Sequence, residues 1–248
     1  MVVANNVRQF AKQLNPIVVV ITLLVFFSLI KLGLWQAQRA DEKELRLARI
    51  AQFTLASPSS IGDIKQLLSN NEEINDIPVK IEGNFKSPLM LLDNQPNGKQ
   101  LGYRVIQPVE VADSVLLVNL GWVAGSIDRS KLPDVQALSG KHQFIGHVRI
   151  PEHGIQISEK VIEKFEQVLR IQYLALAKIS QETGQKLLPF VVYLDKNELI
   201  GFEKNWQPIV MPPEKHRAYS FQWFSLATAW ILLMLSAMYF NRAKNNKK

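Results

Sequence analysis

The feature that most constrains this chain is an uncharged, largely apolar stretch of 24 residues, 218–241. As an α-helix, which rises about 1.5 Å per residue, it is long enough to cross a hydrocarbon layer of about 30 Å. A helix also pairs its own backbone groups, which lipid would leave unsatisfied. We therefore predict a membrane span over residues 218–240, followed by a short tail over 241–248.

A second apolar segment lies near the N-terminus, where 18 residues without charge run from Gln13 to Ile30. Lys31 and Trp35 follow, and side chains of these types reach from a helix to the membrane–water interface. We predict a first span over residues 16–35. A cleaved signal peptide is the alternative, but it requires small residues at the cleavage site, and Gly33-Leu34-Trp35-Gln36 is a poor match.

Two spans place both ends of the chain on the same side of the membrane. The tail after the second span carries four basic residues in eight, which places it in the cytoplasm by the positive-inside rule. Basic residues after Trp35 oppose this orientation, but acidic residues are mixed with them, and long domains are translocated with little regard to charge. We predict cytoplasmic tails over 1–15 and 241–248, and a periplasmic domain over 36–217 attached to a bacterial inner membrane.

The charge distribution argues against a nucleic-acid partner. Seven of the 29 basic residues lie in or beyond the apolar segments, which leaves 22 basic residues to balance 22 acidic ones. The formal charge of +7 therefore reflects membrane orientation and not a phosphate-binding patch. The chain has no cysteine, which excludes disulfides, thiolate metal sites and cysteine nucleophiles.

Period-two alternation and clusters of turn-forming residues predict that the middle of the chain is rich in strand. Residues 93–98 are dense in turn formers and suggest a hairpin between the strands on either side. The expected strands cover 78–85, 89–92, 102–111, 115–123, 142–150, 167–173 and 188–194. The predicted fold class is α+β: two transmembrane helices flank a mostly antiparallel sheet, or a barrel, with one or two helices.

Helical patterns appear at three places in this middle region. Residues 36–53 have one charged and one apolar face, and we expect them to continue the first span out of the membrane. Ser60 is placed to cap a short helix that ends near Leu68. A further helix is expected over 174–183, where Gly184 would end it.

A search for catalytic residues favours a protein that is not an enzyme. There is no phosphate-binding loop, no Gly-x-Gly-x-x-Gly fingerprint, and Gly125-Ser126 lacks the second glycine of a nucleophile elbow. His142 and His147 are five residues apart on a predicted strand, so they point to opposite faces and cannot share a metal.

His216 is the exception because it stands at the entrance to the second span. Tyr219 and Trp223 follow it at i+3 and i+7. One interpretation is a histidine that only anchors the helix at the interface. The other is an axial ligand to a heme iron, with Trp223 and Trp35 against the macrocycle. On the second interpretation, the propionates would be met by Arg217 and Arg39, whose alternative role is that of ordinary interfacial cations.

Three blocks of sequence resemble the Surfeit locus protein family, the assembly factors of cytochrome c oxidase. They are Leu32-Gly33-Leu34-Trp35-Gln36-Ala37-Gln38-Arg39, then Gly102-Tyr103-Arg104-Val105-Ile106-Gln107-Pro108-Val109 with Leu116-Leu117-Val118-Asn119-Leu120-Gly121-Trp122-Val123, and Pro213-Glu214-Lys215-His216-Arg217-Ala218-Tyr219 with Gln222-Trp223-Phe224. The blocks fall in the family's order between two spans. The resemblance therefore covers essentially the whole chain.

The resemblance implies an inner-membrane protein that promotes maturation of oxidase subunit I alongside other oxidase assembly factors. Bacterial members are thought to hold heme a for insertion, and the family's histidine at the second span matches His216. Some relatives carry an aspartate in an aromatic block before the late helix, which the corresponding residues here, 170–175, do not contain.

Three hypotheses follow for the function. The first is a chaperone that binds heme a through His216 and passes it to subunit I. The second is a scaffold that stabilises subunit I without binding heme. The third is a membrane-tethered envelope or sensor protein unrelated to respiration. The first requires the two membrane helices to be neighbours, with Trp35 near His216 or Trp223.

Overall fold

A computed structural model describes residues 16–128, 130–151, 161–165 and 168–245. These residues form two compact units. One holds the helical ends of the chain, up to Arg49 and from Ile209 onward, and the other is a β-rich domain over Ile50–Pro208.

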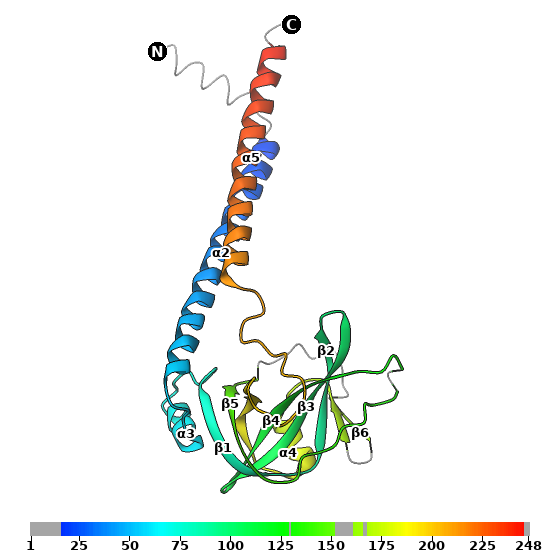
Figure 1. Cartoon of the computed structure of the whole chain (residues 1–248). Helices are drawn as coiled ribbons and strands as arrows, with labels where there is room; N and C mark the ends of the chain where they lie inside the picture. Colours follow the sequence, from blue (N-terminus) through cyan, green and yellow to red (C-terminus); the bar gives the residue numbers. More distant parts are fainter. Residues whose placement is uncertain (1–15, 129, 152–160, 166–167, 246–248) are drawn as a thin grey trace. The chain divides into compact units, whose positions relative to one another are not determined.

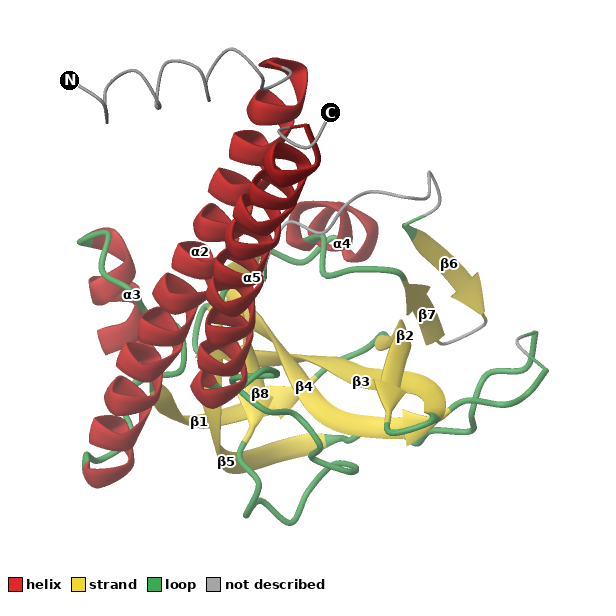
Figure 2. Cartoon of the chain, turned by 90° about the horizontal axis from the view of Figure 1, so that it is seen from above, coloured by secondary structure: helices red, strands yellow, loops and turns green. Residues whose placement is uncertain are grey.

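Two long helices make up the first unit. Helix α2 covers Pro16–Leu55 and helix α5 covers Pro213–Asn245, and they run side by side in opposite directions (Figures 1 and 2). Both are long and apolar enough to cross a membrane. The expectation that the first span continues as a helix over 36–53 is confirmed.

The start of α5 differs from the sequence prediction. The helix begins at Pro213, five residues before the apolar stretch that starts at Ala218. Proline is tolerated at the first helical position, because the backbone N–H that it lacks has no partner there in any case. His216 therefore lies within the first turn of a helix and not in a loop that leads into one.

The contact between α2 and α5 follows a spacing of three and four residues. On α2 the less exposed positions include Val19, Thr22, Phe26, Leu29, Gly33, Gln36, Ala40 and Lys43, and on α5 they include Pro213, His216, Ser220, Trp223, Ala227, Trp230 and Met234. This is the heptad pattern of two helices that pack along a single seam. Two helices that pair within a membrane rely on close packing and polar contacts, because apolar side chains gain little by leaving lipid.

The second unit is built around a closed barrel. Strands β1, β5, β8, β4 and β3 pair in that order, and β1 then pairs with the end of β3. Strands β2, β7 and β6 continue the sheet beyond β3. The bounds are β1 Pro78–Phe85, β2 Leu89–Asn97, β3 Gln100–Val111, β4 Ser114–Ala124, β5 Gly140–Arg149, β6 Ile162–Phe165, β7 Val168–Ile171 and β8 Leu187–Leu194.

The predicted antiparallel sheet or barrel is confirmed, with two exceptions to the antiparallel pairing. Strands β4 and β8 run parallel, as do β2 and β7. Strand β6 was not predicted, since four residues are too few for a clear alternation. The predicted hairpin between β2 and β3 is confirmed, but its turn is shorter than residues 93–98. Strand β2 continues to Asn97, and a register shift between Leu92 and Gln95 accommodates the turn-forming residues.

Both faces of the sheet are covered. The barrel interior is filled by large apolar side chains such as Phe144 and Phe190. On the outer face a smaller cluster that includes Ile106 and Val191 packs against Ile179 of helix α4, Leu176–Thr183. Figure 2 shows α4 near the strands β7 and β2.

The ends of the two short helices match the sequence prediction. Helix α3, Ile61–Ser69, starts with a capping box in which the Ser60 hydroxyl accepts from the N–H of Asp63, and the Asp63 carboxylate accepts from the N–H of Ser60. Helix α4 ends at Gly184, which adopts the left-handed conformation that terminates many helices.

Candidate functional site

His216 lies in the seam between α5 and α2. It is 8% exposed, and its Nδ1 is 2.7 Å from Oε1 of Gln36 on α2. The expectation that the two helices are neighbours at this level is confirmed. The partner across the seam is Gln36, one residue beyond the predicted Trp35.

The hydrogen bond to Gln36 selects one tautomer of His216. An amide oxygen can only accept, so Nδ1 must donate its hydrogen to Oε1. In the neutral ring, Nε2 then carries the free lone pair, which is the form that binds a metal ion. A hydrogen bond of this kind also fixes the orientation of a metal-binding imidazole.

One turn further along α5, the helices approach each other closely. The Ser220 hydroxyl donates to the carbonyl oxygen of Gly33 at 2.8 Å. A Cβ added to Gly33 would lie 2.7 Å from Cε1 of Phe224, well inside van der Waals contact. The absence of a side chain at Gly33 is therefore what allows Phe224 and Ser220 to reach the backbone of α2.

The seam continues toward the other end of the pair, where the indole Nε1 of Trp230 donates to the carbonyl oxygen of Thr22 at 3.1 Å. Trp230, Ser220 and His216 thus each contact the facing helix through a polar group. Interhelical hydrogen bonds in lipid typically contribute about 0.6–2 kcal/mol each. Together they define the register that places His216 opposite Gln36.

The predicted aromatic partners are distributed around this seam. Trp223 is half-buried within it, whereas Tyr219 is 47% exposed on its flank. Trp35 is 51% exposed and points away from the seam positions of α2. The structure therefore groups His216 with Trp223, and it leaves Tyr219 and Trp35 on outer surfaces of the helices.

The two predicted arginines are already engaged in ion pairs at the surface. Arg217 is 2.6 Å from the carboxylate of Glu44 and 3.6 Å from that of Asp41. Arg39 pairs with Glu42 one turn along its own helix at 2.6 Å. Exposed pairs of this kind contribute little to stability, so an incoming carboxylate can compete for either arginine.

A shallow pocket of about 320 Å³ lies beside the seam. Both helices line it, through Ala37, Asp41, Arg217, Ser220, Phe221 and Phe224. His216 does not line this pocket, and 8% of its surface is exposed. Its free nitrogen is of the type that a heme iron takes from histidine.

Sequence reasoning missed Gln36, Gly33 and Ser220 as site residues. The signal for them was a spacing of three or four positions between small and polar residues. On α2 these are Gly33, Gln36 and Ala40, and on α5 they are His216 and Ser220. That spacing identifies the contacting faces but not which residues meet, because the register between the helices is not visible in either one alone.

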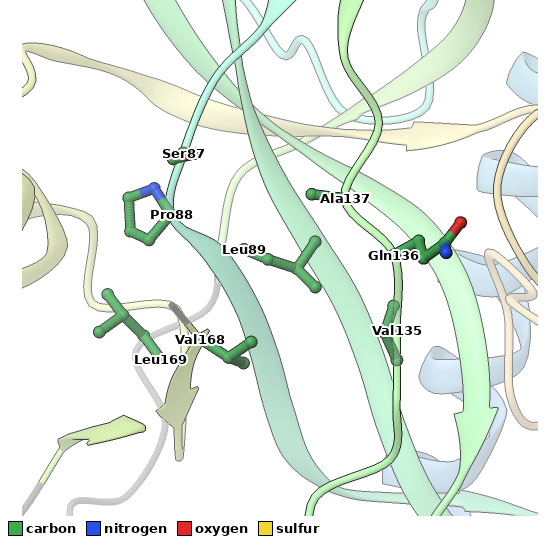
Figure 3. Close-up of a pocket in the computed structure, with 8 residues that line it drawn as sticks. All are labelled: Ser87, Pro88, Leu89, Val135, Gln136, Ala137, Val168 and Leu169. Atoms are coloured by element: carbon green, nitrogen blue, oxygen red, sulfur yellow. The ribbon is translucent and has the colours of Figure 1, made fainter. Parts of the chain in front are cut away.

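The β-rich unit has a pocket of its own, of about 630 Å³, shown in Figure 3. It lies between the starts of β2 and β7 and the loop that carries residues 135–137, toward which Leu89 points. Its lining is Ser87, Pro88, Leu89, Val135, Gln136, Ala137, Val168 and Leu169. None of these eight side chains titrates, so the pocket suits an apolar group and offers no acid, base or charged ligand.

The two histidines of strand β5 point to opposite faces of the sheet, as predicted. His142 stacks edge-on against Phe85, whereas His147 on the opposite face of β5 is hydrogen bonded to Asp195 at 2.8 Å. Within the described part of the chain, no three His, Asp or Glu side chains are grouped so as to hold a metal ion.

Comparison with known proteins gives a consistent result. The model of the SURF1 family matches residues 23–228, which include His216, Gln36, Gly33 and Ser220. The chain is 27% identical over 232 residues to a SURF1-like protein of Rickettsia felis, covering 86% of this chain and 93% of that protein. It is also 27% identical over 225 residues to a SURF1-like protein of Rickettsia conorii and 25% identical over 229 residues to one of Rickettsia bellii.

Proposed function

The chain belongs to the SURF1 family of cytochrome oxidase assembly factors, and we propose that it promotes maturation of oxidase subunit I by binding heme a and handing it over. Heme a is the cargo, and the protein acts as a carrier and not as an enzyme. Other assembly factors would act on the same subunit. The helix pair is the proposed binding element and the β-rich domain the part that faces the periplasm.

The observation that carries this proposal is the hydrogen bond between His216 and Gln36. It presents Nε2 of a neutral imidazole, which is the ligand atom that a heme iron takes from histidine. Trp223 supplies an aromatic surface in the same seam. Arg217 and Arg39 are cations near this level that could exchange their carboxylate partners for heme propionates.

The proposed membrane placement supports handover. In the antiparallel pair, the apolar part of α2 lies alongside the apolar part of α5, and His216 and Gln36 follow at the end of both. With both tails in the cytoplasm, His216 lies at the periplasmic edge of the inner membrane.

The proposal is tested by deleting the gene and by purifying the protein. We expect loss of assembled oxidase in the deletion strain, measured as cytochrome oxidase activity and as heme a bound to subunit I. The full chain purified from cells that make heme a should show a Soret absorption band. A heme-free protein that still co-purifies with subunit I would support the scaffold function instead, and normal oxidase in the deletion strain would rule out both.

Replacing Gln36 by leucine is expected to lower heme affinity about 10- to 100-fold, the usual effect of removing the partner that orients a metal-binding histidine. Leucine is close in size but cannot accept from Nδ1, so the ring loses its fixed tautomer and orientation. Heme titration of the purified full chain, followed at the Soret band, measures the change.

Two further variants make this result specific. Gln36→Glu keeps an acceptor for Nδ1 and should restore most of the affinity. Gln38→Leu alters an exposed glutamine on the same helix, whose amide contacts Glu42, and should have no effect. Equal heme affinity in Gln36→Leu and wild type would show that Gln36 does not position His216.

A further inference from the structure

The pocket beside the seam changes from charged to apolar along both helices. Asp41 on α2 and Arg217 on α5 line it at the end away from the apolar stretches. Ala37, one turn nearer the span of α2, lines its apolar part together with Phe221 and Phe224 of α5. A phospholipid beside a membrane helix has the same order, because its charged head lies at the interface and its chains lie in the hydrocarbon layer.

The guanidinium of Arg217 has hydrogen-bond donors that no described residue uses. Its contacts with Glu44, at 2.6 Å, and with Asp41, at 3.6 Å, are both made through one nitrogen, Nη2. Its Nε and Nη1 make no hydrogen bond to any residue that the structure describes. A guanidinium binds phosphate oxygens through N–H groups of this kind. Arg217 can therefore hold a phosphate while it keeps its contact with Glu44.

The carboxylate of Asp41 is the complementary group in the same pocket. Its side chain is 70% exposed, and the one ion pair that the described residues give it, with Arg217, is too long at 3.6 Å for a hydrogen bond. A carboxylate only accepts hydrogen bonds, so its natural partner is a donor such as an ammonium group. The pocket thus places a cation and an anion together, and each can take a further partner of opposite charge.

From this arrangement we propose that the pocket binds a membrane phospholipid with a zwitterionic head of the phosphoethanolamine type. The phosphate accepts from Arg217 and the ammonium donates to Asp41, while an acyl chain lies along Phe221, which is 75% exposed. The site rests on the proposed membrane placement of α2 and α5, and it does not depend on heme binding by His216.

The lining of the pocket favours this lipid over related ligands. Phosphatidylglycerol has the phosphate but no cation for Asp41, and the quaternary ammonium of phosphatidylcholine has no N–H to donate. A soluble phosphate ester lacks the chain that would cover Phe221 and Phe224. Charge complementarity therefore selects the head, and the apolar part of the pocket selects a ligand that comes from the membrane.

The test uses the full chain in detergent, purified from cells that do not make heme a, because Arg217 is also a proposed partner of a heme propionate. Phosphatidylethanolamine, phosphatidylcholine and phosphatidylglycerol with identical chains are added in turn, and native mass spectrometry measures the bound lipid. We expect phosphatidylethanolamine to bind about twofold to fivefold more tightly than the other two, the effect of one further ion pair at an exposed site. Glycerophosphoethanolamine, the same head without chains, should not displace it at equal concentration.

Two variants locate the binding. Arg217→Met keeps the apolar stem of the side chain without its charge and should weaken binding of all three lipids by about three- to tenfold. Asp41→Asn should remove the preference for phosphatidylethanolamine and leave the binding of phosphatidylcholine unchanged. Lys215→Met and Glu42→Gln change exposed charged residues that do not line the pocket, and both should keep the wild-type preference.

The proposal is wrong if the wild type binds the three lipids equally, or if Arg217→Met and Asp41→Asn both bind them as the wild type does. It is also wrong if the soluble head displaces the lipid, since the chain then contributes nothing. Any of these results would leave the membrane placement intact. That placement would instead be contradicted by a full chain that stays in solution without detergent, and the heme site by the absence of a Soret band.

Discussion

Replacing His216 by alanine is expected to reduce heme in the purified full chain by more than about tenfold, because the change removes the proposed ligand of the iron itself. The chain should still be made and inserted, since alanine favours helix and the contact of Ser220 with Gly33 is retained. The measurement is the ratio of Soret absorbance to protein, in protein from cells that make heme a.

The matched control for this variant is His142→Ala, which changes a half-buried histidine on the barrel strand β5. Its heme content should equal that of the wild type. Free imidazole added to the His216→Ala protein should restore part of the heme spectrum by occupying the vacated ligand position. A His216→Ala protein that keeps its full heme content at equal yield would show that His216 is not the axial ligand.

Replacing Gly33 by isoleucine is expected to disrupt the site while every residue around His216 remains present. Even a Cβ at this position would meet Phe224 at 2.7 Å, and a branched side chain has to push the helices apart. Overpacking of this kind typically costs about 1–3 kcal/mol, which corresponds to a change of roughly 5- to 150-fold in the equilibrium constant for pairing of the helices. Heme content should fall several-fold.

The controls separate helix packing from a general effect on the membrane span. Gly33→Ala should have a smaller effect, because only the outer edge of the Phe224 ring has to move. Leu34→Val alters the next residue, which is 59% exposed, and should have none. If Gly33→Ile and Leu34→Val hold equal amounts of heme, close packing at Gly33 does not contribute to the site.

Several elements of the fold were predictable because their signal is local. The alternation in β1 predicted its bounds, Pro78–Phe85, and Ser60 and Gly184 marked helix ends through backbone chemistry. Strand β6 was not predictable because it has only four residues. The end of β2 was not predictable because a bulge between Leu92 and Gln95 lets turn-forming residues continue the strand. The closure between Phe85 and Val109 depends on curvature of the whole sheet, which no single strand encodes.

The candidate site shows the same division. His216 could be selected from the sequence, because a lone titratable side chain beside an apolar stretch is visible in one dimension. Its partner could not, because Gln36 lies 180 residues away and resembles Gln38, which faces outward. The helical period places Gln36 on the same face of α2 as Gly33 and Ala40, and only the register with α5 decides that it meets the imidazole.

The sequence by itself determined that the chain has two membrane-length helices around a neutral, strand-rich domain, because hydropathy and periodicity are properties of a segment and its solvent. The tertiary structure decided which groups are left with unmet hydrogen-bonding capacity. Nδ1 of His216 is paired with Oε1 of Gln36, a residue 180 positions away, and this leaves Nε2 as the free nitrogen of the ring. Whether a polar group has a hydrogen-bond partner depends on the distance and direction to that partner, and both are set only when the elements pack together.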